Sequence, residues 1–366
     1  MGILPNILSH RWSEKLLRGG SMGRFSWNRH LLGLDIGSQA IKLVQVRKDQ
    51  GNWHLHRFGV IDIASTRNGA GDDYSTSKVG ERVKDLIREN HVQGTRVATA
   101  MNGAAVITKM IEMPSMTQQE LAEHLEWELD QYVPVPPSQL YWDFVVSTPS
   151  NGTNGSRMTV LLVAAKKDMV NERLELLRQV GLDPIIVDID GLTLINMYVW
   201  NYKPEEHEVV LLVNVGPSGL TMSLVEGKRP VYLRNATIGG RWQKDVLDGK
   251  GEEIPENVEK DSGRLEEQEA LDVLRDDLYV EMAREIRKTI DYCQENFPKG
   301  QVENIFLCGG YAGLPGLVEK VGRHLSLPVR MANPFKTLAR EAGREDMRKA
   351  SLAGVAVGLA LRAIGE

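Results

Sequence analysis

The chain has 366 residues, of which 42% are hydrophobic and 25% charged, and its formal net charge is −5. This composition is typical of a globular protein with two domains and insertions, and the acidic charge gives no reason to expect nucleic-acid binding. The two cysteines, Cys293 and Cys308, lack partners at zinc-ligand spacing, which argues against a zinc site or a disulfide framework and indicates a reducing compartment.

Residues 1–30 form a basic leader with five Lys/Arg and one acid. Its apolar residues fall near one face of a helix with the basic groups beside them, so one interpretation is a peripheral helix on an anionic membrane surface. The alternative is a disordered leader, or residues upstream of a shorter chain that begins at Met22. Pro5 and Asn6 interrupt the short apolar stretch, so the leader is not a secretory signal and we expect a cytoplasmic protein.

The first half of the chain is predicted to span 31–104 and 166–190. Runs of β-branched and apolar residues between turn residues predict the order β-β-β-α-β, followed after an insertion by one helix and one strand. The predicted strands are Leu31–Ile36, Ala40–Arg47, Trp53–Ile63, Thr95–Ala100 and Ile185–Asp188, and the predicted helices are Ser77–Asn90 and Asp168–Val180.

The insertion, residues 105–165, is predicted to be a small βαββ subdomain. Thr117 and Glu120 form a capping box at the start of a helix, which must end at the proline-rich run 133–137. The Asn/Gly-rich segment 151–156 favours a hairpin loop between two strands. The predicted strands are Val106–Met113, Leu140–Ser147 and Met158–Ala165.

The second half, 191–240 and 303–366, repeats the β-turn-β-β order of the first, which indicates duplicated halves. Residues 241–302 are a further insertion, in which 241–277 is predicted to be solvated helix and loop. The predicted strands are Val209–Val215, Leu220–Glu226, Val231–Thr237 and Glu303–Leu307, and the predicted helix is Leu278–Asn296. The weakly polar run 350–365 is too short to cross a bilayer, and its small residues predict a helix packed closely against a sheet.

Three glycine-containing turns each follow a hydrophobic strand. They are Asp35-Ile-Gly37-Ser38, Asn214-Val-Gly216-Pro-Ser218-Gly, and Gly309-Gly310-Tyr-Ala-Gly313. In the first two, which are hairpin turns, backbone N–H groups can point at phosphate oxygens, and a strand-end carboxylate such as Asp35 can hold the water shell of Mg²⁺. Two such turns at matching positions of duplicated halves are more specific than one. Neither a GxxxxGK[ST] loop nor a GxGxxG turn that opens a helix occurs.

These turns resemble the first phosphate, second phosphate and adenosine segments of the superfamily that joins actin, the heat-shock chaperone ATPases and the sugar kinases. Four further segments, 33–46, 110–136, 236–247 and 351–362, resemble the PilM family of type IV pilus assembly proteins. The resemblance covers about residues 31–366, and the insert is its most specific part. It implies an α/β, actin-like (ribonuclease H-like) duplicated fold with an FtsA-type inserted subdomain.

The resemblance implies ATP and Mg²⁺ as cofactors and assigns roles to matching residues. Asp35 would bind Mg²⁺ through water, while Gly37 and Ser38 would hold the β/γ-phosphates. Lys42 has the spacing of the phosphate-binding lysine in actin, and its alternative is an outward-facing strand lysine. The other residues assigned to the nucleotide are Asn214, Gly216 and Ser218 in the second phosphate turn, Gly309, Gly310 and Gly313 beneath the nucleotide, and Glu285 with Lys288 at the ribose.

Further residues have an alternative role or depart from the family pattern. Glu285 and Lys288 would equally form a surface i,i+3 ion pair. Asp190 would position water, or would simply cap a helix. The second phosphate turn has Asn214 where the family has Asp, and Pro217 removes one backbone donor, so phosphate binding is expected while hydrolysis is in doubt.

The resemblance implies an ATP-binding scaffold of the type IV pilus inner-membrane assembly complex. The insert and the first half would form a groove for the N-terminal cytoplasmic peptide of PilN, at the inner face of the inner membrane. Pilus motor ATPases are further expected partners, and homo-oligomerisation stays open. The alternatives are a small-molecule kinase, an FtsA-like division protein and a type II secretion L-like protein. We find no base-bearing loop for the first, no terminal amphipathic helix for the second and no transmembrane helix for the third.

Overall fold

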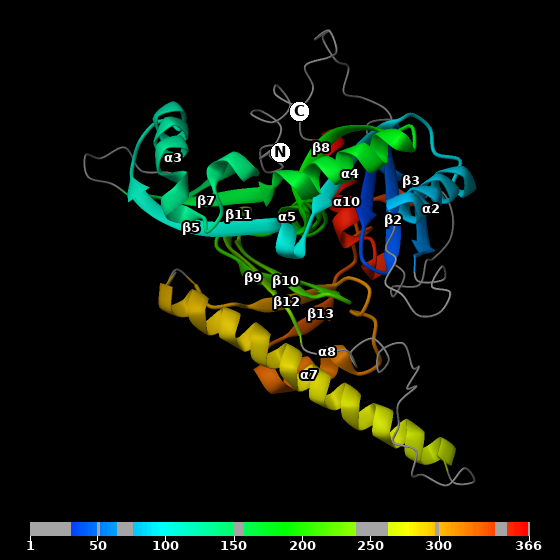
Figure 1. Cartoon of the computed structure of the whole chain (residues 1–366). Helices are drawn as coiled ribbons and strands as arrows, with labels where there is room; N and C mark the ends of the chain where they lie inside the picture. The colour runs from blue at the N-terminus through cyan, green and yellow to red at the C-terminus, as the bar shows by residue number, and fades with distance from the viewer. Residues whose placement is uncertain are drawn as a thin grey trace.

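The computed structural model describes residues 31–49, 52–63, 76–148, 157–238, 263–296, 300–340 and 350–364. The basic leader predicted at 1–30 and the hairpin loop predicted at 151–156 lie outside these residues. Within them, three sheets form the framework of the molecule (Figure 1).

The first sheet has six strands in the order β14-β3-β2-β1-β4-β8. The strands are β1 (Leu32–Ile36), β2 (Ala40–Asp49), β3 (Asn52–Asp62), β4 (Arg96–Met101), β8 (Asp183–Ile189) and β14 (Ala339–Arg340). β1, β2 and β3 form an antiparallel meander, and β4 and β8 run parallel to β1. The helices α2 (Thr76–Glu89) and α4 (Lys167–Gln179) precede β4 and β8, as parallel pairing requires a crossover.

The second sheet repeats this arrangement with five strands in the order β11-β10-β9-β12-β13. The strands are β9 (Val209–Gly216), β10 (Gly219–Glu226), β11 (Arg229–Ala236), β12 (Asn304–Cys308) and β13 (Val329–Met331). β9, β10 and β11 form the meander, and β12 lies parallel to β9 as β4 lies parallel to β1. The duplicated α/β arrangement predicted from the sequence is therefore confirmed.

The inserted unit is a three-stranded sheet, β5-β7-β6, covered on one face by a helix. Its elements are β5 (Val106–Pro114), α3 (Gln118–Tyr132), β6 (Leu140–Thr148) and β7 (Arg157–Lys166). The predicted capping box starts α3, because the Thr117 N–H donates to Glu120 Oε2 at 2.8 Å and the Glu120 N–H to Thr117 Oγ1 at 3.3 Å. The leucines of α3 pack against the sheet, and we refer to this unit as the inserted subdomain.

The opposite face of the inserted subdomain packs on β11, the edge strand of the second sheet. Thr108 Oγ1 donates a hydrogen bond of 3.1 Å to the Leu233 carbonyl, and the Ser147 hydroxyl donates to the Pro230 carbonyl. Hydroxyl groups from the inserted subdomain thus satisfy two backbone acceptors of β11.

Helix α7 (Gly263–Asn296) runs beneath the second sheet as one long helix (Figure 1). It begins well before Leu278, where the sequence predicted its start, because no glycine or proline interrupts the chain between Gly263 and Asn296. Its C-terminal part joins the core of the second half, together with α8 (Leu317–Leu325).

Two helices join the halves: α5 (Asp190–Tyr202), which leaves the first sheet, and α10 (Gly354–Ala360), which is entirely buried. A side chain at Gly358 would collide with the Thr193 carbonyl of α5, so only glycine allows this approach. The close packing predicted from the small residues of 350–365 is therefore confirmed.

The C-terminal segments return to the first sheet. β14 pairs with β3, and α10 packs against β1, β2 and β4, whereas the sequence interpretation placed 303–366 in the second half. The segment η4 (Leu361–Ile364) then brings Arg362 to Asp188 of β8, where the two side chains are 1% and 2% exposed and Arg362 Nε donates to Asp188 Oδ2 at 2.7 Å.

Candidate functional site

The matching hairpin turns of the two halves meet each other. The β1–β2 turn carries Ser38 and the β9–β10 turn carries Ser218, 180 residues further along the chain. The Ser218 hydroxyl donates to the Ser38 hydroxyl, and the two oxygens are 3.1 Å apart. The duplication therefore brings both glycine turns together where the two halves meet.

The third glycine turn, which follows β12, packs directly on the second. Gly309 has φ +99°, and a side chain there would collide with the Asn214 side-chain oxygen. The Tyr311 N–H donates to the Val215 carbonyl at 3.0 Å. Gly310 and Gly313 lie in the same turn region ahead of α8, where a side chain at Gly310 would meet only the end of Leu352.

Two residues that sequence reasoning did not single out connect this third turn to the first half. The Tyr311 hydroxyl donates a hydrogen bond of 2.9 Å to the Gln39 side-chain oxygen. Gln39 belongs to the first glycine turn, and Tyr311 is 7% exposed. The available signal was an aromatic residue inside a glycine-rich turn.

A lysine and a carboxylate lie beneath the first turn. Asp35 near the end of β1 is opposite Lys42 of β2, and Lys42 Nζ is 3.1 Å from Asp35 Oδ2. Their side chains are 10% and 12% exposed, so Lys42 does not project outward from its strand. A side chain at Gly37 would come within 2.9 Å of Lys42 Nζ. Glycine at this position therefore allows the turn to lie close to the lysine charge.

Asp190 is a buried carboxyl group at the start of α5. It is the first helical residue rather than the N-cap, which is Ile189, so the simple capping interpretation is wrong. Its Oδ1 has no hydrogen-bond partner within the described part of the chain. Burial, and then the charge of Asp35, raise the pKa of Asp190 to about 8, while Lys42 opposes this shift. At neutral pH the group is therefore mostly protonated.

A small cavity of about 10 Å³ lies beside Asp190. Its polar lining comes from both halves and comprises Asn102, Thr108, Asp190, Thr221, Arg234 and Asn235. This volume is close to the smallest that holds one water molecule, and such a water needs polar partners of this kind.

Glu285 and Lys288 form an ion pair on α7, with Lys288 Nζ 2.6 Å from Glu285 Oε1. Glu285 also binds Arg234 of β11 at 2.7 Å and is 15% exposed, so the carboxylate holds α7 to the second sheet. The Lys288 hydrogen bond, and then that of Arg234, lower the pKa of Glu285 against the effect of burial. Within the described ranges, no hydrogen bond or ion pair joins Glu285 or Lys288 to the three turns.

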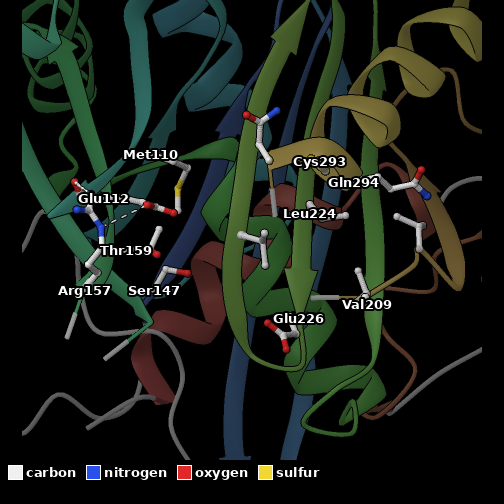
Figure 2. A pocket seen from close by; sticks show the side chains of 14 residues that line it. Met110, Glu112, Ser147, Arg157, Thr159, Val209, Leu224, Glu226, Cys293 and Gln294 are labelled. Carbon is white, nitrogen blue, oxygen red and sulfur yellow. Dashed lines mark hydrogen bonds and ion pairs between the residues drawn. The ribbon is translucent and has the colours of Figure 1, made fainter. Parts of the chain in front are cut away.

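A second, larger cavity of about 330 Å³ lies between the inserted subdomain and the second half (Figure 2). Met110, Glu112 and Thr159 approach it from one side and Leu224 and Cys293 from the other. Arg157 Nε is 3.6 Å from Glu112 Oε2 at its rim, and both side chains are more than half exposed. Burial raises the pKa of the Cys293 thiol to about 12, so this cysteine is not a reactive thiolate.

No helix among the described segments is long and apolar enough to span a membrane. The described residues also contain no group of three or more His, Cys, Asp or Glu side chains that could hold a metal ion.

Comparison with known proteins identifies the fold. The family model described as type IV pilus assembly protein PilM matches residues 33–364. A solved PilM–PilN type IV pilus biogenesis complex matches with a TM-score of 0.74 at 25% identity, covering 92% of this chain and 99% of that chain. The ethanolamine utilization protein EutJ from Carboxydothermus hydrogenoformans has a TM-score of 0.50 at 14% identity, over 90% of this chain and 88% of that chain, and shares the fold alone. The duplicated fold is thus the actin-like fold predicted from the sequence.

Proposed function

The chain belongs to the type IV pilus assembly protein PilM family, and from this premise we propose that it is an ATP-binding scaffold that docks the cytoplasmic tail of a membrane partner. The contact between Ser38 and Ser218 carries the nucleotide part of the proposal, because it brings both glycine turns together where the halves meet. The partner part is supported by the solved relative, which is described as a complex with PilN.

The residues of the glycine turns fit the phosphates of a nucleoside triphosphate. Backbone N–H groups of both turns and the hydroxyls of Ser38 and Ser218 are donors suited to phosphate oxygens, which would replace the present hydroxyl contact. Lys42 is held beneath the first turn and would contribute a positive charge. The glycines of the third turn would lie under the nucleotide, and at Gly309 a side chain would collide with Asn214.

Asp35 fits a magnesium ion bound through its water shell. Asp35 offers one carboxylate near the end of a buried strand. This matches the way Mg²⁺ binds beside phosphates, since the ion keeps several waters and uses one or two protein carboxylates. When bound, Mg²⁺ supplies charge that neutralises the phosphates. Asp35 would then orient the ion's waters, and Lys42 would exchange part of its pairing with Asp35 for the phosphate.

Binding without rapid hydrolysis follows from two groups. Asn214 cannot accept a proton, although the family pattern has an acid at this position. Asp190 is a candidate for positioning water beside the small cavity, but with its pKa raised to about 8 only a small fraction of the molecules carry the carboxylate that could accept a proton at neutral pH. Both features favour a nucleotide-loaded scaffold over an enzyme with fast turnover.

The inserted subdomain is the proposed docking unit. It is an addition to the duplicated halves and carries the most specific part of the family resemblance. We propose that it receives the N-terminal cytoplasmic peptide of PilN, which would hold the protein at the inner face of the inner membrane, near the pilus motor ATPases. A peptide in such a groove binds through apolar side chains and main-chain hydrogen bonds.

The experiment that tests this function measures both binding events on the full chain. Equilibrium titration with ATP, with and without Mg²⁺, should show Mg²⁺-strengthened binding and turnover well below about 1 s⁻¹, the low end of typical enzyme rates. Titration with a PilN-like tail peptide should show saturable binding. Absence of tail binding at roughly millimolar peptide would overturn the scaffold assignment, and absence of ATP binding would overturn the nucleotide assignment.

A further inference from the structure

The largest exposed apolar side chain of the described residues is Trp127, on helix α3 of the inserted subdomain. Its exposed fraction is 86%, although tryptophan is normally among the more buried residue types. Leu121, Leu125 and Leu129 already fill the buried face of α3, so Trp127 has no part in the core. An indole that contributes nothing to folding is typical of a binding anchor.

The acidic and basic residues of α3 itself are all of one sign apart from His124. Helix α3 carries five acids, Glu120, Glu123, Glu126, Glu128 and Asp130, and no Lys or Arg. Glu123 and Asp130 are four residues before and three after Trp127, so they lie beside the indole on the same exposed face. The described contacts of Glu120 and Glu128 are with Thr117, His124 and Tyr132 rather than with a Lys or Arg.

The exposed indole and the carboxylates of α3 together indicate which class of partner this face would bind. Anionic lipid headgroups would repel the five carboxylates, so Trp127 is not placed as a membrane anchor. An indole face flanked by carboxylates suits Lys or Arg side chains, which stack on the ring while their charges meet the acids. The cytoplasmic segments that adjoin membrane-spanning helices are enriched in Lys and Arg.

We propose that the exposed face of α3 centred on Trp127 binds the Lys/Arg-bearing segment that adjoins the membrane in the partner's cytoplasmic tail. This proposal rests on the proposed function, because it assumes that a tail docks on the inserted subdomain. It adds a second contact, in which the preceding part of the tail docks elsewhere on the inserted subdomain and the cationic segment lies along α3. The helix stands at the outer end of the inserted subdomain, where such a segment can approach it (Figure 1).

The test compares two tail peptides on the full chain by isothermal titration. The long peptide includes the cationic segment that adjoins the membrane, and the short peptide ends before it. We expect the long peptide to bind the unmodified protein about tenfold more tightly, with the difference shrinking as salt is raised. Trp127→Ala and the charge reversal Glu123→Lys/Asp130→Lys should each reduce the long peptide to the affinity of the short one.

Matched variants separate this contact from folding. Trp127→Ala should leave the melting temperature unchanged, because the side chain is already exposed. Val273→Ala, which truncates a 61% exposed side chain on α7, and Glu175→Lys on α4 should leave both affinities unchanged. Equal binding of the long peptide to unmodified protein and Trp127→Ala overturns the inference while the proposed function stands. Failure of both peptides to bind the unmodified protein overturns the proposed function itself.

Discussion

Tyr311 and Gln39 join the two halves of the molecule through one hydrogen bond of 2.9 Å between residues 272 positions apart. Together with the Ser38–Ser218 contact, it connects the first glycine turn to both turns of the second half. If a nucleotide replaces the Ser38–Ser218 contact, we expect the Tyr311–Gln39 hydrogen bond to persist and to hold the halves together around it.

We expect Tyr311→Phe to accelerate nucleotide release by about 2- to 10-fold, the loss of one hydrogen bond worth about 0.5–1.5 kcal/mol. The ring stays in place, so the fold should be unaffected. Stopped-flow dissociation of a fluorescent ATP analogue measures the rate. Tyr279→Phe is the control, because its hydroxyl bonds to the Pro315 carbonyl within the second half. Equal release rates for both variants would contradict the closing role of Tyr311.

Asp190→Asn should remove a pH dependence of stability. The folded pKa of Asp190, about 8, lies above the ordinary carboxyl value, so the unfolded chain loses this proton first and stability falls as pH rises from about 4 to 8. The melting-temperature gain of the variant over the unmodified protein should therefore be about 2 °C or more larger at pH 8 than at pH 4.5. Asp168→Asn removes an exposed carboxylate from the first turn of α4 and should show no such trend.

Asn214→Asp should increase ATP hydrolysis by about tenfold or more, if a proton acceptor at this position limits the rate. Aspartate has the same shape as asparagine and fits against Gly309. Single-turnover phosphate release measures the effect. Asn304→Asp is the control, because Asn214 pairs with Cys308 at one end of β12 and Asn304 lies at the other end. An unchanged rate would show that the missing carboxylate is not the limiting feature.

Arg362→Met should destabilise the protein by about 3–5 kcal/mol, because it leaves the Asp188 carboxylate buried without its cation. The double variant Asp188→Leu/Arg362→Met should recover much of that loss, since both charges are then removed. Urea unfolding midpoints of the three proteins provide the comparison. A double variant no more stable than Arg362→Met would show that the pair has a role beyond cancelling its own two charges.

Local sequence patterns predicted the elements well, and long-range packing accounts for most of what they missed. The capping box at Thr117 and the meanders of both halves depend on neighbouring residues, which is why they could be predicted. The pairing of β14 with β3 and the contact between Tyr311 and Gln39 depend on residues far apart in the chain. No local periodicity reports such contacts.

The candidate site was likewise predictable where it depends on local patterns and not where it depends on long-range packing. The three glycine turns were predicted from strand-turn patterns and from family resemblance, and the structure brings them into contact with one another. The raised pKa of Asp190 was not predictable, because it arises from burial by the packed halves and from the charge of Asp35. The exposure of Trp127 was equally hidden, since the helical pattern does not show which face lacks a cover.

The hydroxyls of Thr108 and Ser147 in the inserted subdomain donate hydrogen bonds to carbonyls of the edge strand β11. Without them, β11 would be an open sheet edge, ready to pair with the same strand of another chain. We therefore expect a deletion of residues 105–165 to expose this edge and to promote association of chains through the second sheet.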